Sequence, residues 1–187
     1  MGQRTAILVK RVDKNGKVDI RLIHDQWGIG KVMPAYFLKE LMNYYYGYDK
    51  YNNKKTIRSY FKFNTKKNNL YKKSNKNIDV FDIKNIKEWF SITDNNNGGM
   101  IVEIVEKEDS RYSYYIEIES IKISFILGDE ECYNYIGNER IEIEQPFSRL
   151  VTANEYMKKT GGDTYCPIEF RNAFDNILKT FKITQVL

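Results

Sequence analysis

Two apolar segments joined by an Asn-Gly pair near the start of the chain place the strongest constraint on the fold. Residues 4–12 read RTAILVKRV, and residues 18–25 read VDIRLIHD. Asn15-Gly16 lies between them and supplies the positive φ angles that a tight type I′ turn requires. We therefore expect a β-hairpin over residues 4–25. Four residues of its second strand recur at every second position and share one face: Val18, Ile20, Leu22 and His24.

Further strands are expected in the second half of the chain. Residues 99–107, 112–119 and 121–127 are apolar or alternating segments, and the polar sequence EDSR joins the first two as a second hairpin. Residues 140–144 are expected to form an additional edge strand, and residues 183–187 could close the chain as a strand.

Two main helices are expected, at about 33–46 and 167–181. In the first, Pro34 suits the opening turn, and apolar residues recur at helical spacing from Pro34 to Tyr45. In the second, Pro167 opens a segment whose apolar residues also fall on one helical face.

Shorter helices are expected at 83–90 and 152–159. In the latter, Thr152 and Glu155 have the spacing of a capping box. Strands gathered in hairpins, with helices between the groups, predict an α+β fold with an antiparallel sheet. The length of 187 residues favours a single domain, 1–187, that carries an insertion at 50–77.

The insertion at 50–77 has an unusual charge. It holds ten Lys or Arg and no Asp or Glu, whereas the rest of the chain has 20 basic and 25 acidic residues. Lysines neutralise phosphates and aromatic side chains stack on bases, so the segment is a candidate site for nucleic acid or an acidic partner. Its candidate binding residues are Lys54, Lys55, Arg58, Lys62, Lys66, Lys67, Lys72, Lys73 and Lys76. A solvated insertion, enriched in Lys and Asn by AT-rich codons, is the alternative.

Tyrosines are the second candidate for partner contacts. The chain has 15 of them, and a helix is too narrow to bury the whole run at 44–48 on one face. Exposed tyrosine is favoured at protein interfaces. The candidate partner-binding aromatic residues are Tyr44, Tyr46, Tyr48, Tyr51 and Tyr60.

Catalytic and metal-binding patterns are not found, so no catalytic residue, metal ligand or cofactor is predicted. His24 is the single histidine, and Asp25 points to the other face of a strand. Cys132 and Cys166 are 34 residues apart without a Cys-x-x-Cys motif, which fits reduced thiols in a cytoplasmic protein. A Mg²⁺ nuclease built from carboxylates stays open as the third alternative. No segment has transmembrane length, so no membrane partner is expected.

The start of the chain resembles that of small phage and prophage proteins. Those proteins begin Met-Gly-x-Arg and carry a His/Trp/Asp/Gly cluster before their first helix. The matching residues here are Gly2, Arg4, His24, Asp25, Trp27 and Gly28, with Asp25 before Trp27 where the family has the reverse order. The resemblance covers about the first quarter of the chain. It implies a mobile-element setting, in which small non-enzymatic proteins that block a host defence complex are common, and it implies no catalytic role.

Three functional hypotheses follow. The first is a non-enzymatic phage or mobile-element protein that binds and inhibits a host defence factor in the host cytoplasm, in the manner of an anti-CRISPR protein. The second is a nucleic-acid-binding module that uses residues 50–77, and the third is the Mg²⁺ nuclease. The expected partner is a host protein, with nucleic acid or a second copy of the chain as other candidates.

Overall fold

The computed structural model places the chain in an α+β fold, which confirms the expected fold class. For Asp25, residues 69–73, Ile116 and Tyr135 it describes the backbone alone. The residues described are 4–25, 33–38, 41, 69–73, 78–92, 97–108, 116–129, 131–159 and 175–187.

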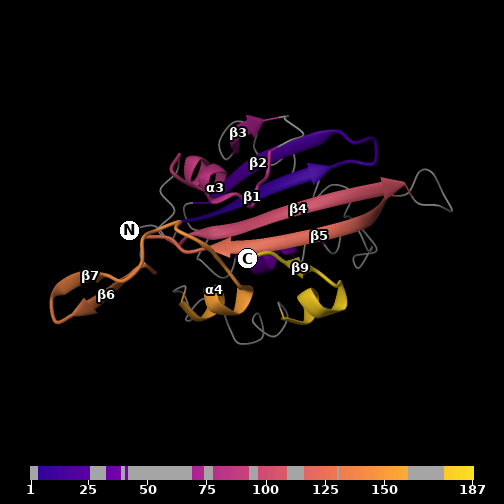
Figure 1. Ribbon diagram of the computed structural model, residues 1–187. Helices are drawn as coiled ribbons and strands as arrows, with labels where there is room; N and C mark the ends of the chain where they lie inside the picture. The colour runs from indigo at the N-terminus through magenta and orange to yellow at the C-terminus, as the bar shows by residue number, and fades with distance from the viewer. Residues whose placement is uncertain are drawn as a thin grey trace.

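The main sheet has the strand order β3-β2-β1-β4-β5-β8, and β9 pairs with β5 (Figure 1). Its strands are β1 (Thr5–Val12), β2 (Val18–Asp25), β3 (Asn69–Lys73), β4 (Gly99–Glu108), β5 (Ile116–Ile126), β8 (Leu150–Val151) and β9 (Thr184–Gln185). A separate two-stranded ribbon consists of β6 (Tyr133–Ile136) and β7 (Glu139–Glu142). The described helical residues are α3 (Ile83–Phe90), α4 (Ala153–Lys159), residues 33–38 with 41, and residues 175–180.

The first hairpin, β1–β2, is confirmed, but the type I′ turn is wrong. Gly16 has a φ of 73°, whereas Asn15 keeps a negative φ. The Gly16 N–H donates to the Asp13 carbonyl at 2.8 Å, as in a type I turn followed by a left-handed glycine. The reason is Asp13, whose carboxylate accepts from the N–H groups of Asn15 and Lys17 and holds the chain in this wider turn.

The second hairpin is also confirmed, as β4 and β5 pair antiparallel over almost their full lengths. The division of residues 112–127 into two strands is wrong, because β5 is continuous. The register shift that places Val105 opposite Ser120 and Glu106 opposite Ile118 leaves Glu119 as an extra residue. The polar Glu119-Ser120 pair therefore marks a β-bulge and not a turn. Residues 112–115 lie outside the described residues.

The two hairpins are joined through parallel strands, so the sheet is mixed and not wholly antiparallel. β1 and β4 run parallel, with Ala6 opposite Gly99. Between these strands the chain passes through β2, β3 and α3, and α3 packs on one face of the sheet before β4 enters. This crossover brings β4 back beside β1 in the same direction. The residue patterns within each hairpin do not predict this parallel pairing.

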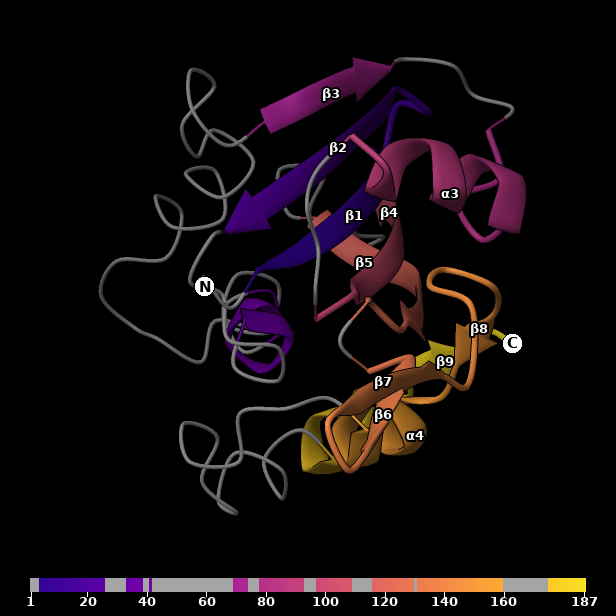
Figure 2. The same ribbon diagram turned by 90° about the vertical axis from the view of Figure 1, so that its left-hand side faces the viewer.

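Helices cover both faces of the sheet, which explains the continuous apolar runs in the central strands. Strands buried on both sides need apolar residues at consecutive positions. Ile7 and Val9 belong to the core under helical residues 33–38 and 41, α4 and helical residues 175–180. Ala6 and Leu8 belong to the opposite core, where α3 contributes its fully buried aromatic side chains. Figure 2 shows α3 on the other side of the sheet from the remaining helices.

The helices begin and end largely as their sequences predict. Helical residues 33–38 and 41 confirm the described part of the first main helix, and 175–180 that of the second; the remainder of each lies outside the described residues. The predicted helix at 83–90 is α3, capped by Asp82, and the one at 152–159 is α4. Thr152 Oγ1 accepts from the Glu155 N–H at 3.1 Å, as the capping-box spacing predicts.

Candidate protein-binding surface

The β6–β7 ribbon projects from the body of the molecule, and all four residues of β7 are exposed (Figure 1). Ile136 pairs with Glu139 across a two-residue turn, in which Gly137 has a φ of 66°. A positive φ at the first central residue is what a type II′ hairpin turn requires. Sequence reasoning expected only an edge strand at 140–144 and a polar connection before it, so it missed β6. The signal was Gly137-Asn138 between two short segments rich in β-branched and aromatic residues.

One face of the ribbon carries three isoleucines, with Asn134 and Glu139 beside them. Residues directly opposite each other share a face, so the pairings Asn134–Ile141 and Ile136–Glu139 place both isoleucines on one side. The Ile143 N–H donates to the carbonyl of Cys132, two residues before Asn134, so the antiparallel register continues beyond β7. Ile143 lies two residues after Ile141 and therefore falls on the same face. The exposed fractions are 68% for Ile136, 38% for Ile141 and 53% for Ile143. Three exposed isoleucines on one side of a projecting element form an unusual surface for a chain that buries apolar residues on both faces of its sheet.

The opposite face of the ribbon is polar. Tyr133 lies opposite Glu142, and the Arg140 guanidinium sits 3.7 Å from the centroid of the Tyr133 ring. A cation over an aromatic face is worth about 0.5–1 kcal/mol at an exposed site. This contact stiffens the ribbon from its polar side and leaves the isoleucine side open.

The base of the ribbon is tied to the body of the protein. The Cys132 carbonyl accepts from the N–H groups of Ile143 and Glu144 at 2.8 and 3.2 Å, and the Cys132 side chain is fully buried in the core under α4. Burial, with help from Glu144 and Glu131, raises the pKa of the Cys132 thiol to about 11. The thiol is therefore protonated at neutral pH and serves as a packing group and not as a nucleophile.

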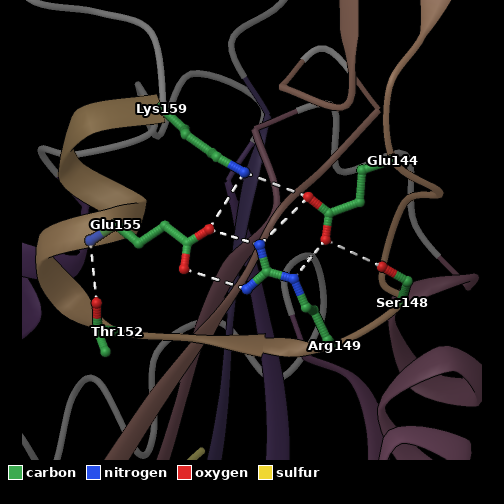
Figure 3. A network of polar contacts seen from close by, with 6 residues as sticks. All are labelled: Glu144, Ser148, Arg149, Thr152, Glu155 and Lys159. Atoms are coloured by element: carbon green, nitrogen blue, oxygen red, sulfur yellow. Dashed lines mark hydrogen bonds and ion pairs between the residues drawn. The ribbon is translucent and has the colours of Figure 1, made fainter.

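A network of ion pairs fixes the segment that leaves the ribbon onto α4 (Figure 3). Arg149 Nε lies 2.7 Å from Glu144 Oε1, and its Nη1 lies 3.1 Å from Glu155 Oε2. Lys159 Nζ also bridges both carboxylates, at 3.3 Å from Glu144 and 3.1 Å from Glu155. Ser148 donates to Glu144 at 3.3 Å. Glu144 follows β7 directly and Glu155 and Lys159 belong to α4, so the network joins the ribbon to the helix.

All four charged groups of this network stay ionised at neutral pH. The hydrogen bond from Arg149 lowers the pKa of Glu155 to about 2. Burial would raise the pKa of Glu144, but Lys159 and Arg149 outweigh it and lower that pKa. The carboxylates in turn raise the pKa values of Arg149 and Lys159. A balanced set of fixed charges supplies no proton donor or acceptor near pH 7, so we assign it a structural role.

A shallow depression of about 490 Å³ lies on the α3 side of the sheet. Glu103 lies in it, 2.8 Å from Lys10 and 3.3 Å from Lys122. Burial alone would raise the pKa of Glu103, but the two lysines reverse the effect and lower it. The carboxylate is thus ionised and paired with two cations, which makes it a poor general acid or base.

The described part of the chain offers neither a metal site nor a membrane span. It contains no group of three or more His, Cys, Asp or Glu side chains that could hold a metal ion. Within it, no helix combines the length and the apolar character needed to span a bilayer.

Few of the residues singled out from the sequence lie in the described part. His24 is half-buried on β2 opposite Ala6, and Asp25 ends that strand. Arg4 accepts from the Asn97 N–H through its carbonyl at 3.1 Å. Lys72 and Lys73 lie in β3. The others lie outside the described residues: Trp27, Gly28, Tyr44, Tyr46, Tyr48, Tyr51, Lys54, Lys55, Arg58, Tyr60, Lys62, Lys66, Lys67 and Lys76.

Comparisons of the chain with protein-family models, with curated proteins and with solved structures found no match. What the protein does is therefore inferred from its own residues and their arrangement.

Proposed function

We propose that the protein acts by binding another protein through the isoleucine face of the β6–β7 ribbon, and that it inhibits this partner without a catalytic step. The observation that carries the proposal is the exposure of Ile136, Ile141 and Ile143 on one side of a projecting element. Their exposed fractions together amount to about one and a half isoleucine side chains. Complete burial of that surface in a partner would contribute about 2–4 kcal/mol.

The anchoring of the ribbon supports this reading. A loop that must order on binding loses conformational entropy, whereas a ribbon held in advance does not. The Cys132 hydrogen bonds and the Arg149 network hold the base of the ribbon in the free protein. The isoleucines are thus presented on a stiff support.

The biological setting we propose is that of a phage or mobile-element protein that blocks a host defence factor. The resemblance of the first quarter of the chain to small phage and prophage proteins supports it. The paired state of Glu103 and of the Arg149 network supports a binding role over the carboxylate-dependent nuclease.

The proposal is tested by capturing a partner from the lysate of a bacterial host on the tagged protein, before and after nuclease treatment. A stoichiometric protein that survives the nuclease, and that is lost with the double variant Ile136→Ser/Ile141→Ser, is the expected result. The matched control is Ile92→Ser, since Ile92 is 44% exposed after α3 and lies outside the ribbon. Equal capture by wild type and the double variant would refute the role of the ribbon.

Nucleic-acid binding through residues 50–77 is the second candidate. The observation that favours it is the position of β3, which brings Lys72 opposite Arg21 at the edge of the sheet. The test is the salt dependence of affinity for a fluorescent single-stranded oligonucleotide. Replacing Lys66, Lys67, Lys72 and Lys73 with Gln should reduce the log–log salt slope by up to about 3, at roughly 0.7 per phosphate contact. An unchanged slope would rule this candidate out.

A further inference from the structure

The net charge of the chain resides in two segments. Residues 129–144 contain six acidic residues and one arginine, which gives −5, and residues 50–77 contain ten basic residues and no acidic one, which gives +10. The chain has 30 basic residues, of which ten lie in 50–77 and one lies in 129–144, so 19 lie elsewhere. Of the 25 acidic residues, 6 lie in them, which also leaves 19. The rest of the sequence is balanced, so these two segments hold the whole excess of charge, with opposite signs.

The fold places β3, from the basic segment, and the ribbon, from the acidic segment, toward opposite sides of the sheet. β3 is the first strand in the order β3-β2-β1-β4-β5-β8. The ribbon follows β5, the last strand but one in that order. β3 and β5 are four strand spacings apart, or about 19 Å. Figure 2 shows β3 at the top of the molecule and β6 and β7 at the bottom.

Both segments present a strand edge. Among the described strands, β3 pairs with β2 alone, and β6 and β7 pair with each other alone. β3 and β7 therefore each have one side with no described strand beside it. Such edges are templates for adding a strand from another chain, because their N–H and C=O groups are available for pairing. β3 has five residues and β7 has four, so their lengths match.

The charges of the two edges are complementary. β3 contains Lys72 and Lys73, and β7 contains Glu139 and Glu142. Both glutamates are exposed, and neither makes an ion pair with another residue that the structure describes. Opposite charges on neighbouring strands attract, whereas like charges repel.

We propose that β7 of one copy of this chain docks against the edge of β3 of a second copy, in a head-to-tail contact held by Lys72 and Lys73 against Glu139 and Glu142. The contact joins two different surfaces, so it is heterologous and continues into larger assemblies or rings. It uses Glu139 and Glu142 at the β7 edge, one on each face of the ribbon, whereas the proposed function uses the isoleucine side chains. The variant Ile136→Ser/Ile141→Ser leaves both carboxylates in place. The two proposals can therefore fail separately.

The experiment is sedimentation velocity on the full chain at a series of protein concentrations, in 50 mM and in 500 mM NaCl. In 50 mM NaCl the mean mass should rise with concentration above the monomer mass of 22.2 kDa. In 500 mM NaCl it should return to the monomer, because salt screens exposed charges over a Debye length of only about 4–5 Å. A monomer at every concentration in 50 mM NaCl would overturn the proposal.

Charge reversal tests the pairing. The variants Glu139→Lys/Glu142→Lys and Lys72→Glu/Lys73→Glu should each weaken self-association at least about tenfold, since both turn attraction into repulsion. An equimolar mixture of the two should associate again, because each then meets an edge of opposite charge. Far-ultraviolet circular dichroism checks that the variants are folded. Lys84→Glu/Lys87→Glu on α3 makes the same charge change as the β3 variant, but outside both strands, and should associate like wild type. Association that survives both reversals, or a mixture that stays monomeric, would overturn the assignment of these edges.

Discussion

Replacing Arg149 with methionine should make the protein less stable at neutral pH and barely change it at pH 2. Arg149 donates to Glu155 and Glu144 and is the centre of the network at the base of the ribbon. Methionine keeps much of the length and apolar volume of the side chain and removes the guanidinium. The change therefore isolates the electrostatic contribution of the network.

The expected loss of unfolding free energy follows from the lowered pKa of Glu155. Its pKa falls from 4.5 to about 2 through the hydrogen bond from Arg149. A shift of this size corresponds to at most about 3.4 kcal/mol, at about 1.36 kcal/mol per pKa unit. The Arg149 side chain is 47% exposed, so solvent screens the pair, and about 1 kcal/mol is the realistic value. For a chain of this length that is about 2–4 °C in Tm.

The sign of the pH dependence is fixed by the lowered pKa. A carboxylate whose pKa is depressed in the folded protein stabilises it fully above the unfolded value of about 4.5. This stabilisation is lost as the pH falls through about 2, where the folded-state carboxylate takes up its proton. The difference in unfolding free energy between wild type and Arg149→Met should therefore be about 1 kcal/mol at pH 7 and near zero at pH 2.

The assay is urea unfolding of both proteins at the two pH values, followed by circular dichroism. Arg140→Met is the matched control, because the Arg140 guanidinium contacts the Tyr133 ring and the Asp129 carbonyl and makes no ion pair with a described carboxylate. Its effect should be the same at both pH values. An equal cost of Arg149→Met at pH 7 and pH 2, or no cost at pH 7, would refute the electrostatic account of the network.

Three further substitutions test the packing, each by urea unfolding. Gly99→Ala should cost about 3 kcal/mol, because the new Cβ would lie 2.0 Å from the Ala6 carbonyl oxygen and push β1 and β4 apart; a cost below 1 kcal/mol would contradict this. Arg11→Met should cost about 3 kcal/mol, since Arg11 donates to both oxygens of the fully buried Glu106, at 2.6 and 2.9 Å; a near-neutral effect would show that the buried carboxylate needs no such support. Gly137→Ala should cost about 1 kcal/mol through its φ of 66°, whereas Gly137→Asn should cost less, and equal effects would argue against the turn geometry.

Local sequence patterns were enough to predict the elements that are specified by residues close together in the chain. The β1–β2 and β4–β5 hairpins follow from alternation and polar turns, and α3 and α4 follow from capping residues and apolar spacing. The first turn was assigned to the wrong type because the Asp13 carboxylate, two positions before Asn15, accepts from the N–H groups of Asn15 and Lys17. A side chain two positions outside the Asn-Gly motif changed the turn.

The features that were not predicted depend on contacts between residues that are far apart in the chain. The parallel pairing of β1 with β4 joins residues 93 positions apart and depends on how α3 packs. The network at the ribbon joins Glu144, Arg149, Glu155 and Lys159, which are spread over up to 15 positions of the chain and come together only when α4 packs beside the end of the ribbon. The candidate surface was missed because exposed isoleucines in a four-residue strand have the same composition as buried ones. Only the position of the ribbon outside the body distinguishes them.

The affinity of a captured partner for the isoleucine face tests the central claim most directly. Isothermal titration of the purified partner into wild type and into Ile136→Ser/Ile141→Ser compares proteins that differ only on that face. The two side chains expose about one isoleucine equivalent between them. Its loss should cost about 2 kcal/mol, or roughly 30-fold in Kd, while Ile92→Ser binds like wild type. An unchanged Kd for the double variant would contradict the claim that the protein binds its partner through the ribbon.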